Sequence, residues 1–208
     1  MSDSTDPREH RLTIPRSARC FSQGGEAAAE AWIVLHGYGQ LASRFLRNLE
    51  SLATPTRLVV APEGLSRFYL DAGGGKVGAS WMTKEDRVRE IEDYLGYLDL
   101  VRATLLPPVP LTILGFSQGV ATAARWAVRT APAPVRLIAW GGLMPEEISA
   151  ASLVSIRLTY VVGEQEEWAP PAAVEAQAAA FRTAGGAVEV VRFEGGHEIL
   201  PEVVARLV

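Results

Sequence analysis

Residues 110–125 read PLTILGFSQGVATAAR, which combines a short apolar strand pattern, a tight turn and a helix pattern. The apolar run 111–114 is typical of a strand buried in a sheet. The turn Gly115-Phe116-Ser117-Gln118-Gly119 follows, and the alanine-rich residues after it predict a helix. A G-x-S-x-G turn between a strand and a helix lifts its serine onto an exposed tip, where the hydroxyl can act as a nucleophile. The pentapeptide is also compatible with Ser117 as the N-cap of an ordinary helix, so the rest of the chain must distinguish the two interpretations.

The composition of the 208-residue chain is that of a globular protein, with 48% hydrophobic and 21% charged residues. The formal net charge of −4 offers no basic surface for nucleic acid. No apolar run is long enough to span a bilayer, and the polar N-terminus lacks the apolar core of a secretory signal. Cys20 is the only cysteine, so we expect neither an intrachain disulfide nor a thiolate metal site. These features predict a cytoplasmic protein without a metal or cofactor, as a monomer or homodimer, with a flexible tail (1–10) and one domain (11–208).

Strand and helix patterns alternate along the chain, which predicts an α/β fold with a mostly parallel, doubly wound sheet. The predicted strands are 11–22 at an edge, 31–35, 57–61, 111–114, 135–140, 156–162 and 188–193. The predicted helices are 41–52, 83–106 with Thr83 as its cap and Val88 on its buried face, 120–126, 170–184 and 201–208. Residues 63–82 show no period and predict a long functional loop.

A serine hydroxyl needs a base to take its proton, and histidine suits this role because it titrates near neutral pH. The chain has three histidines. His10 lies in the predicted tail and His36 in a loop that opens a helix, whereas His197 directly follows the last predicted strand. Because active groups of such sheets gather at the carboxyl ends of the strands, His197 is the predicted base.

The base needs an acidic partner, which should follow a strand between the serine and the histidine in the chain. The segment GEQEEW, residues 163–168, is the acidic cluster that directly follows such a strand. Its glutamates Glu164, Glu166 and Glu167 all compete for the role, and the pattern alone leaves the three open.

Four motifs together resemble one family: LHGYG (35–39), GFSQG (115–119), GEQEEW (163–168) and GGH (195–197). They are similar to the phospholipase/carboxylesterase group of α/β-hydrolases, which includes acyl-protein thioesterases, and the resemblance runs from about Trp32 to the C-terminus. It implies an α/β-hydrolase fold without a large cap domain. It also implies a serine carboxylic-ester hydrolase that forms an acyl-enzyme from an ester or thioester with an apolar acyl group.

The resemblance also implies roles for individual residues. The family usually has an aspartate three residues after the glycine that closes the strand, and Glu166 stands at this position here. With Ser117 and His197 it would complete a catalytic triad. The oxyanion would be bound by the backbone N–H groups of Gln118, the residue after the nucleophile, and of Tyr38, the residue after His-Gly. Gln40 stands near the place where the family often has an aspartate.

The substrate pocket is expected at the long loop that follows the strand 57–61, because in the family this loop lines the acyl groove. Apolar side chains in or beside the loop, beside the acid and after the strand 135–140 suggest a cleft for an acyl or aryl group. The residues concerned are Phe68, Tyr69, Trp81, Met82, Leu143 and Trp168.

Two other classes of function compete with the hydrolase. The segment 37–42 fits G-x-G-x-x-A after a strand and before a helix, with Glu63 about 20 residues on, which is the pattern of a dinucleotide site. Glu63 follows Pro62, beyond the second strand, and an oxyanion loop explains the same glycines. A non-catalytic small-molecule-binding protein on the same fold is the other alternative.

Overall fold

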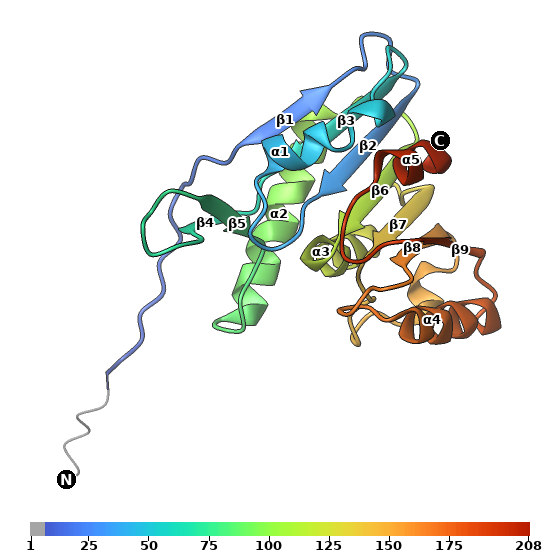
Figure 1. The fold of residues 1–208 in the computed structure, drawn as a ribbon. Coiled ribbons are helices and arrows are strands. Elements are labelled where there is room, and N and C mark those ends of the chain that lie inside the picture. Colours follow the sequence, from blue (N-terminus) through green and yellow to red (C-terminus); the bar gives the residue numbers. More distant parts are fainter. Residues whose placement is uncertain (1–6) are drawn as a thin grey trace.

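The computed structural model describes residues 7–208, and its centre is a twisted seven-stranded sheet (Figure 1). Its strand order is β1-β3-β2-β6-β7-β8-β9, and every neighbouring pair is parallel except β1 with β3. The mostly parallel sheet predicted from the sequence is therefore confirmed. The strands are β1 (Cys20–Gln23), β2 (Glu30–Leu35), β3 (Arg57–Pro62), β6 (Leu111–Phe116), β7 (Arg136–Trp140), β8 (Arg157–Gly163) and β9 (Val188–Phe193).

Helices cover both faces of the sheet, because successive side chains of each strand point to opposite faces and both sets are apolar. One face packs against α2 (Arg87–Leu105), α3 (Gln118–Ala127) and α4 (Pro171–Thr183), and the other against α1 (Ala42–Arg47) and α5 (Pro201–Val204). The short 3-10 helices are η1 (Glu50–Leu52), η2 (Ala150–Leu153) and η3 (Ala205–Leu207). Within residues 7–208 the chain builds no cap domain of several helices over the sheet.

The carboxyl ends of the parallel strands meet at one edge of the sheet, and this arrangement gathers the candidate residues. In the ladder, Leu35 pairs with Gly115, Phe116 with Trp140, and Gly163 with Phe193. The loops that carry the predicted nucleophile, base and acid therefore begin at the same edge of the sheet, as the doubly wound topology requires.

A hairpin occupies part of the segment that was predicted as an irregular loop. Strands β4 (Ser66–Tyr69) and β5 (Val77–Ser80) pair antiparallel and form a separate two-stranded sheet. Each has only four residues, so the period-two pattern is too short to recognise in the sequence. The hairpin packs against the loop after β2, since Gly39 N–H donates to Ala79 O (2.9 Å) and Ala79 N–H donates to Gln40 O (3.1 Å).

The predicted edge strand near the N-terminus and the start of the long helix α2 differ from the structure. The edge strand expected over 11–22 is limited to β1, and residues 7–19 contain no helix or strand. The part of the predicted tail that covers residues 1–6 lies outside the described residues. The long helix begins at Arg87 rather than at Thr83, because Asp86 adopts a left-handed conformation (φ 47°) that separates residues 83–86 from the helix. Val88, predicted on the buried face, is exposed.

Candidate active site

Ser117 occupies a sharp turn between β6 and α3 with φ 53° and ψ −119°, a conformation that side-chain-bearing residues seldom adopt. Its N–H donates to Trp140 O (2.9 Å), and its hydroxyl does not cap the helix. A Cβ at Gly115 would collide with the backbone of Gly119, and a Cβ at Gly119 would collide with Leu35 O. The two glycines of the motif are thus required by close backbone packing, which favours the nucleophile interpretation over an ordinary N-cap.

His197 and Glu166 form a short hydrogen bond, with Nδ1 2.7 Å from Oε2. Glu166 is 4% exposed, and its other carboxylate oxygen accepts the Trp168 N–H at 2.8 Å. Because a carboxylate oxygen only accepts, the imidazole proton lies on Nδ1 and leaves Nε2 free to take a proton. The imidazole also packs against Phe116, the residue before the serine, with ring centroids 4.8 Å apart.

The glutamates that compete with Glu166 are placed differently. Glu164 and Glu167 are both exposed, and neither side chain makes a hydrogen bond or ion pair within residues 7–208.

Gly141, at the end of β7, provides the space for the Glu166–His197 pair. A Cβ there would lie 3.1 Å from Glu166 Oε2 and 3.2 Å from His197 Nδ1. Gly141 directly follows the strand predicted over 135–140, and no motif in the sequence indicates this role for it.

The backbone N–H groups of Tyr38 and Gln118 make no hydrogen bond within the part of the chain that the structure describes. Gln118 is the first residue of α3, where an N–H has no partner inside its own helix. The loop that carries Tyr38 lies beside the nucleophile, because a Cβ at Gly37 would lie 3.1 Å from Ser117 Cβ. Two unpaired donors near a serine are the arrangement that an oxyanion hole requires.

His36 and Gln40 anchor this loop from inside the protein. His36 is 0% exposed, its Nε2 accepts the Gly64 N–H (2.9 Å) and its Nδ1 donates to Gly37 O (2.7 Å). Burial lowers the pKa of His36, so the neutral ring that this pairing needs is favoured. Gln40 Oε1 accepts the Gly37 N–H at 2.8 Å, which gives the loop a polar anchor without an aspartate.

Glu63, the acid of the alternative dinucleotide pattern, is buried and paired with Arg19 at 2.7 Å and with Arg67 at 3.2 Å. The turn of the same pattern is held against the β4–β5 hairpin and the serine. Glu63 and the glycine turn, the two parts of the dinucleotide pattern, are therefore both engaged in contacts within the chain.

The side chains predicted to contact substrate divide into exposed and buried ones. Phe68 packs against Tyr38 with ring centroids 5.1 Å apart, and Tyr69 is exposed one residue further along β4. Trp168 is 79% exposed, and its ring lies 6.4 Å from that of His197. Aromatic surface thus stands on both the oxyanion-loop side and the histidine side of Ser117.

Trp81 corrects one of these predictions, because it is 2% exposed and its indole N–H donates to His36 O at 2.8 Å. It packs in the core as a support of the oxyanion loop and offers no surface to a ligand. Met82 and Leu143 are half-buried. The carbonyl of Met82 accepts a hydrogen bond from the Gln118 side chain at 2.8 Å.

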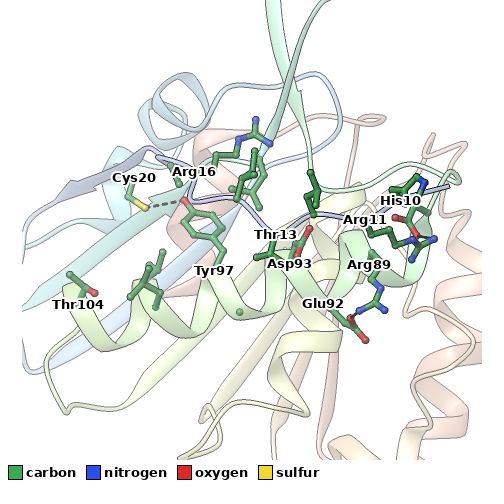
Figure 2. Close-up of a pocket in the computed structure, with 18 of the residues that line it drawn as sticks. His10, Arg11, Thr13, Arg16, Cys20, Arg89, Glu92, Asp93, Tyr97 and Thr104 are labelled. Carbon is green, nitrogen blue, oxygen red and sulfur yellow. Dashed lines mark hydrogen bonds and ion pairs between the residues drawn. The ribbon is translucent and has the colours of Figure 1, made fainter.

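A cavity of about 1130 Å³ lies between residues 9–20 and α2, and none of its lining residues belongs to the candidate triad (Figure 2). In Figure 2 the N-terminal segment runs along α2, and a dashed line joins the Cys20 thiol to the Tyr97 hydroxyl. The two atoms are 3.1 Å apart. Within residues 7–208, no cluster of three or more His, Cys, Asp or Glu side chains is placed to hold a metal ion. In the same range no helix has the length and apolar character needed to cross a membrane.

Solved structures share the fold over most of the chain. Acyl-protein thioesterase 2 from Zea mays is 21% identical, with 92% of this chain and 98% of that chain covered and a TM-score of 0.68. A carboxylesterase from Mesorhizobium loti is 18% identical, with 91% of each chain covered and a TM-score of 0.70. Esterase PE8 is 21% identical, with 92% and 95% covered and a TM-score of 0.66. These likenesses confirm the predicted α/β-hydrolase fold.

A comparison with curated protein sequences finds no significant match. The sequence does match the serine hydrolase (FSH1) family over residues 26–202, a range that contains Ser117, Glu166 and His197. The match confirms the serine hydrolase expected from the motifs. The chain therefore belongs to the serine hydrolase (FSH1) family.

Proposed function

We propose that this protein hydrolyses carboxylic esters or thioesters with an apolar acyl group through an acyl-enzyme on Ser117. The observation that carries the proposal is the hydrogen bond between the buried Glu166 carboxylate and His197, whose ring packs against Phe116 in the turn that holds the serine. The names of the similar structures, an esterase, a carboxylesterase and an acyl-protein thioesterase, support the same chemical class.

In the acylation step, His197 Nε2 takes the proton of the Ser117 hydroxyl while Oγ attacks the acyl carbon. The carbonyl oxygen becomes an oxyanion, and the unpaired N–H groups of Tyr38 and Gln118 stabilise its charge. Glu166 holds the imidazole through Nδ1 and stabilises the imidazolium that forms. His197 then passes the proton to the departing alcohol or thiol as the bond between the acyl carbon and the leaving group breaks.

In the deacylation step, water attacks the acyl carbon of the ester on Ser117 and gives its proton to His197. The same two N–H groups stabilise the second oxyanion, and His197 returns the proton to Ser117 Oγ as the acid is released. The residues described account for every proton in this cycle, so the proposal includes no metal or cofactor.

The proposed acyl and leaving groups would contact the aromatic side chains beside the serine. Phe68 with Tyr38 and the neighbouring Tyr69 offer apolar surface on the oxyanion-loop side, and Trp168 offers it beside His197. We propose that Met82 and Leu143, which are half-buried, also contact the substrate. Apolar burial of this kind favours substrates with a larger acyl group, at about 0.8 kcal/mol for each methylene buried.

The proposal is tested by assaying purified enzyme on p-nitrophenyl esters and on acyl thioesters of stepped acyl length. We expect turnover, with a KM that falls as the acyl chain grows from two carbons. In Phe68→Ala this fall in KM should be smaller. Ser117→Ala should lose about 10³-fold or more of the activity while keeping its fold. A parent enzyme without turnover on any member of the panel would contradict the proposal and favour the non-catalytic binding protein.

A further inference from the structure

We propose that the side-chain amide of Gln118 is a positioning group that sets the geometry of the oxyanion hole. This inference rests on the proposed function, in which the backbone N–H of Gln118 is one of the two oxyanion donors. The side chain makes a separate set of contacts, with residues 80–82. Its contribution can therefore be removed while the backbone donor remains.

The amide of Gln118 is fully engaged with the segment that leaves β5. Its Oε1 accepts the Trp81 N–H at 3.1 Å, and its Nε2 donates to Met82 O at 2.8 Å and to Ser80 Oγ at 3.1 Å. Ser80 Oγ in turn donates to Met82 O at 2.9 Å. One side chain of the nucleophile turn thus fixes three consecutive residues, 80–82.

The same three residues hold the loop that carries the other oxyanion donor. Trp81 donates its indole N–H to His36 O at 2.8 Å, and its ring packs on the His36 imidazole with centroids 5.1 Å apart. Ala79, one residue before Ser80, exchanges backbone hydrogen bonds with Gly39 and Gln40 at 2.9 and 3.1 Å. Tyr38 lies between the two points at which the loop is attached.

A continuous set of hydrogen bonds therefore joins the two proposed donors. It starts at the Gln118 side chain, passes through residues 80–82 and β5, and ends on both sides of Tyr38. Trp81 and Ser80 are almost completely buried, whereas Gln118 and Met82 are half-buried, so the linkage is partly shielded from water. Since an oxyanion is stabilised only by donors at the correct distance, loosening this linkage should affect the transition state more than substrate binding.

Gln118→Met tests the proposal because it keeps the length of the side chain and removes its hydrogen bonds. We expect kcat to fall about 10- to 100-fold, less than or comparable to the loss of one oxyanion donor, with KM changed by less than about 3-fold. Rates are expressed per active site, measured by titration with a fluorophosphonate, so that a loss of folded protein is not counted as a loss of kcat.

Gln177→Met is the matched control, because Gln177 is another amide that clamps a loop. Its Oε1 accepts the Met144 N–H (2.9 Å) and its Nε2 donates to Met144 O (3.0 Å). This variant should lose a similar amount of thermal stability but keep kcat within about 3-fold of the parent. Equal kcat losses in the two variants would mean that the Gln118 amide acts only on stability, and would overturn the proposal.

Ser80→Ala gives a milder version of the same test if Gln118→Met does not fold. It removes a single hydroxyl from the linkage and should lower kcat about 3- to 10-fold with KM little changed. A kcat equal to that of the parent in Ser80→Ala, or in a folded Gln118→Met, would overturn the proposal. In that case the proposed hydrolase function would still stand, because the parent enzyme is active. An inactive parent enzyme would contradict the hydrolase function itself.

Discussion

Glu166 Oε2 lies 2.7 Å from His197 Nδ1, and the carboxylate is 4% exposed. The other oxygen of the carboxylate accepts the Trp168 N–H, so both carboxylate oxygens are hydrogen-bonded. Glu166 stands at the position where the resembled family usually has an aspartate, and its carboxylate reaches the imidazole of His197. Gly141 leaves room beside the pair, since a Cβ there would lie 3.1 Å from Glu166 Oε2.

Glu166→Gln should lower kcat by about 10² to 10⁴, because an amide N–H facing Nδ1 stabilises the wrong tautomer of His197. Glu164→Gln and Glu167→Gln are the controls, since both glutamates are exposed, and each should stay within a few-fold of the parent. The three variants are compared by kcat on one p-nitrophenyl ester. A large loss of kcat in Glu164→Gln or Glu167→Gln, with kcat retained in Glu166→Gln, would show that the acid is misassigned.

Gly141→Ala should lower kcat about 10-fold or more, because the new Cβ would crowd both Glu166 Oε2 and His197 Nδ1. Gly185→Ala is the matched control. Gly185 also has a positive φ (90°), but a Cβ there meets nothing within 4 Å. Both variants should lose about 1 kcal/mol or more of stability from backbone strain. Only Gly141→Ala should lose kcat per active site, and equal kcat values would refute the crowding argument.

Turnover should rise with pH on the acid side of the profile, because only a neutral histidine can take the proton of the serine hydroxyl. The measurement is kcat/KM of the parent on a neutral ester from pH 5 to 9, with His10→Gln as a control that leaves the profile unchanged. A flat profile across this range would be inconsistent with a histidine base.

The fold should lose stability below about pH 6.5 because of His36, whose pKa is lowered by burial. The unfolded chain binds a proton there while the native chain keeps the ring neutral, so unfolding becomes easier as pH falls from 6.5 toward the lowered native pKa. The slope from this group is at most about 1.4 kcal/mol per pH unit. The charge of Glu63, which is paired with Arg19 and Arg67, acts in the opposite direction and raises the pKa of His36.

Urea midpoints from pH 5 to 8 check this expectation. His36→Gln should be less stable than the parent at pH 8 but show a shallower loss of stability toward pH 5. The parent and His10→Gln should have the same slope, since His10 is exposed. Parallel curves for the parent and His36→Gln would mean that His36 does not carry this pH dependence.

The central strands and the order of the active groups could be predicted because their signals are local. The strand 111–116 is mostly apolar and buried along its whole length, and the turn that follows requires the glycines at 115 and 119. Strand β9 has the residues predicted for it. The residue after each strand end lies at one edge of the sheet whatever the strand order. For this reason Ser117 and His197 could be placed near each other without knowledge of the topology.

Features that depend on long-range contacts could not be predicted. The β4–β5 hairpin is held by pairing with residues 39–40, and Trp81 is buried because its indole reaches His36 O. Both partners lie about 40 residues away in the chain. The start of α2 was misplaced because Thr83 bonds through its N–H and hydroxyl to the Glu90 carboxylate, so the apparent cap lies outside the helix.

Labelling with a fluorophosphonate probe tests the central claim most directly, because such probes react with an activated serine. The parent and Ser117→Ala are treated with the same probe and digested, and the modified residue is identified by mass spectrometry. We predict one adduct per chain, on Ser117, together with complete loss of esterase activity, and no adduct in Ser117→Ala. An adduct on another residue, or a Ser117→Ala enzyme that keeps more than about a tenth of the parent kcat, would contradict Ser117 as the nucleophile.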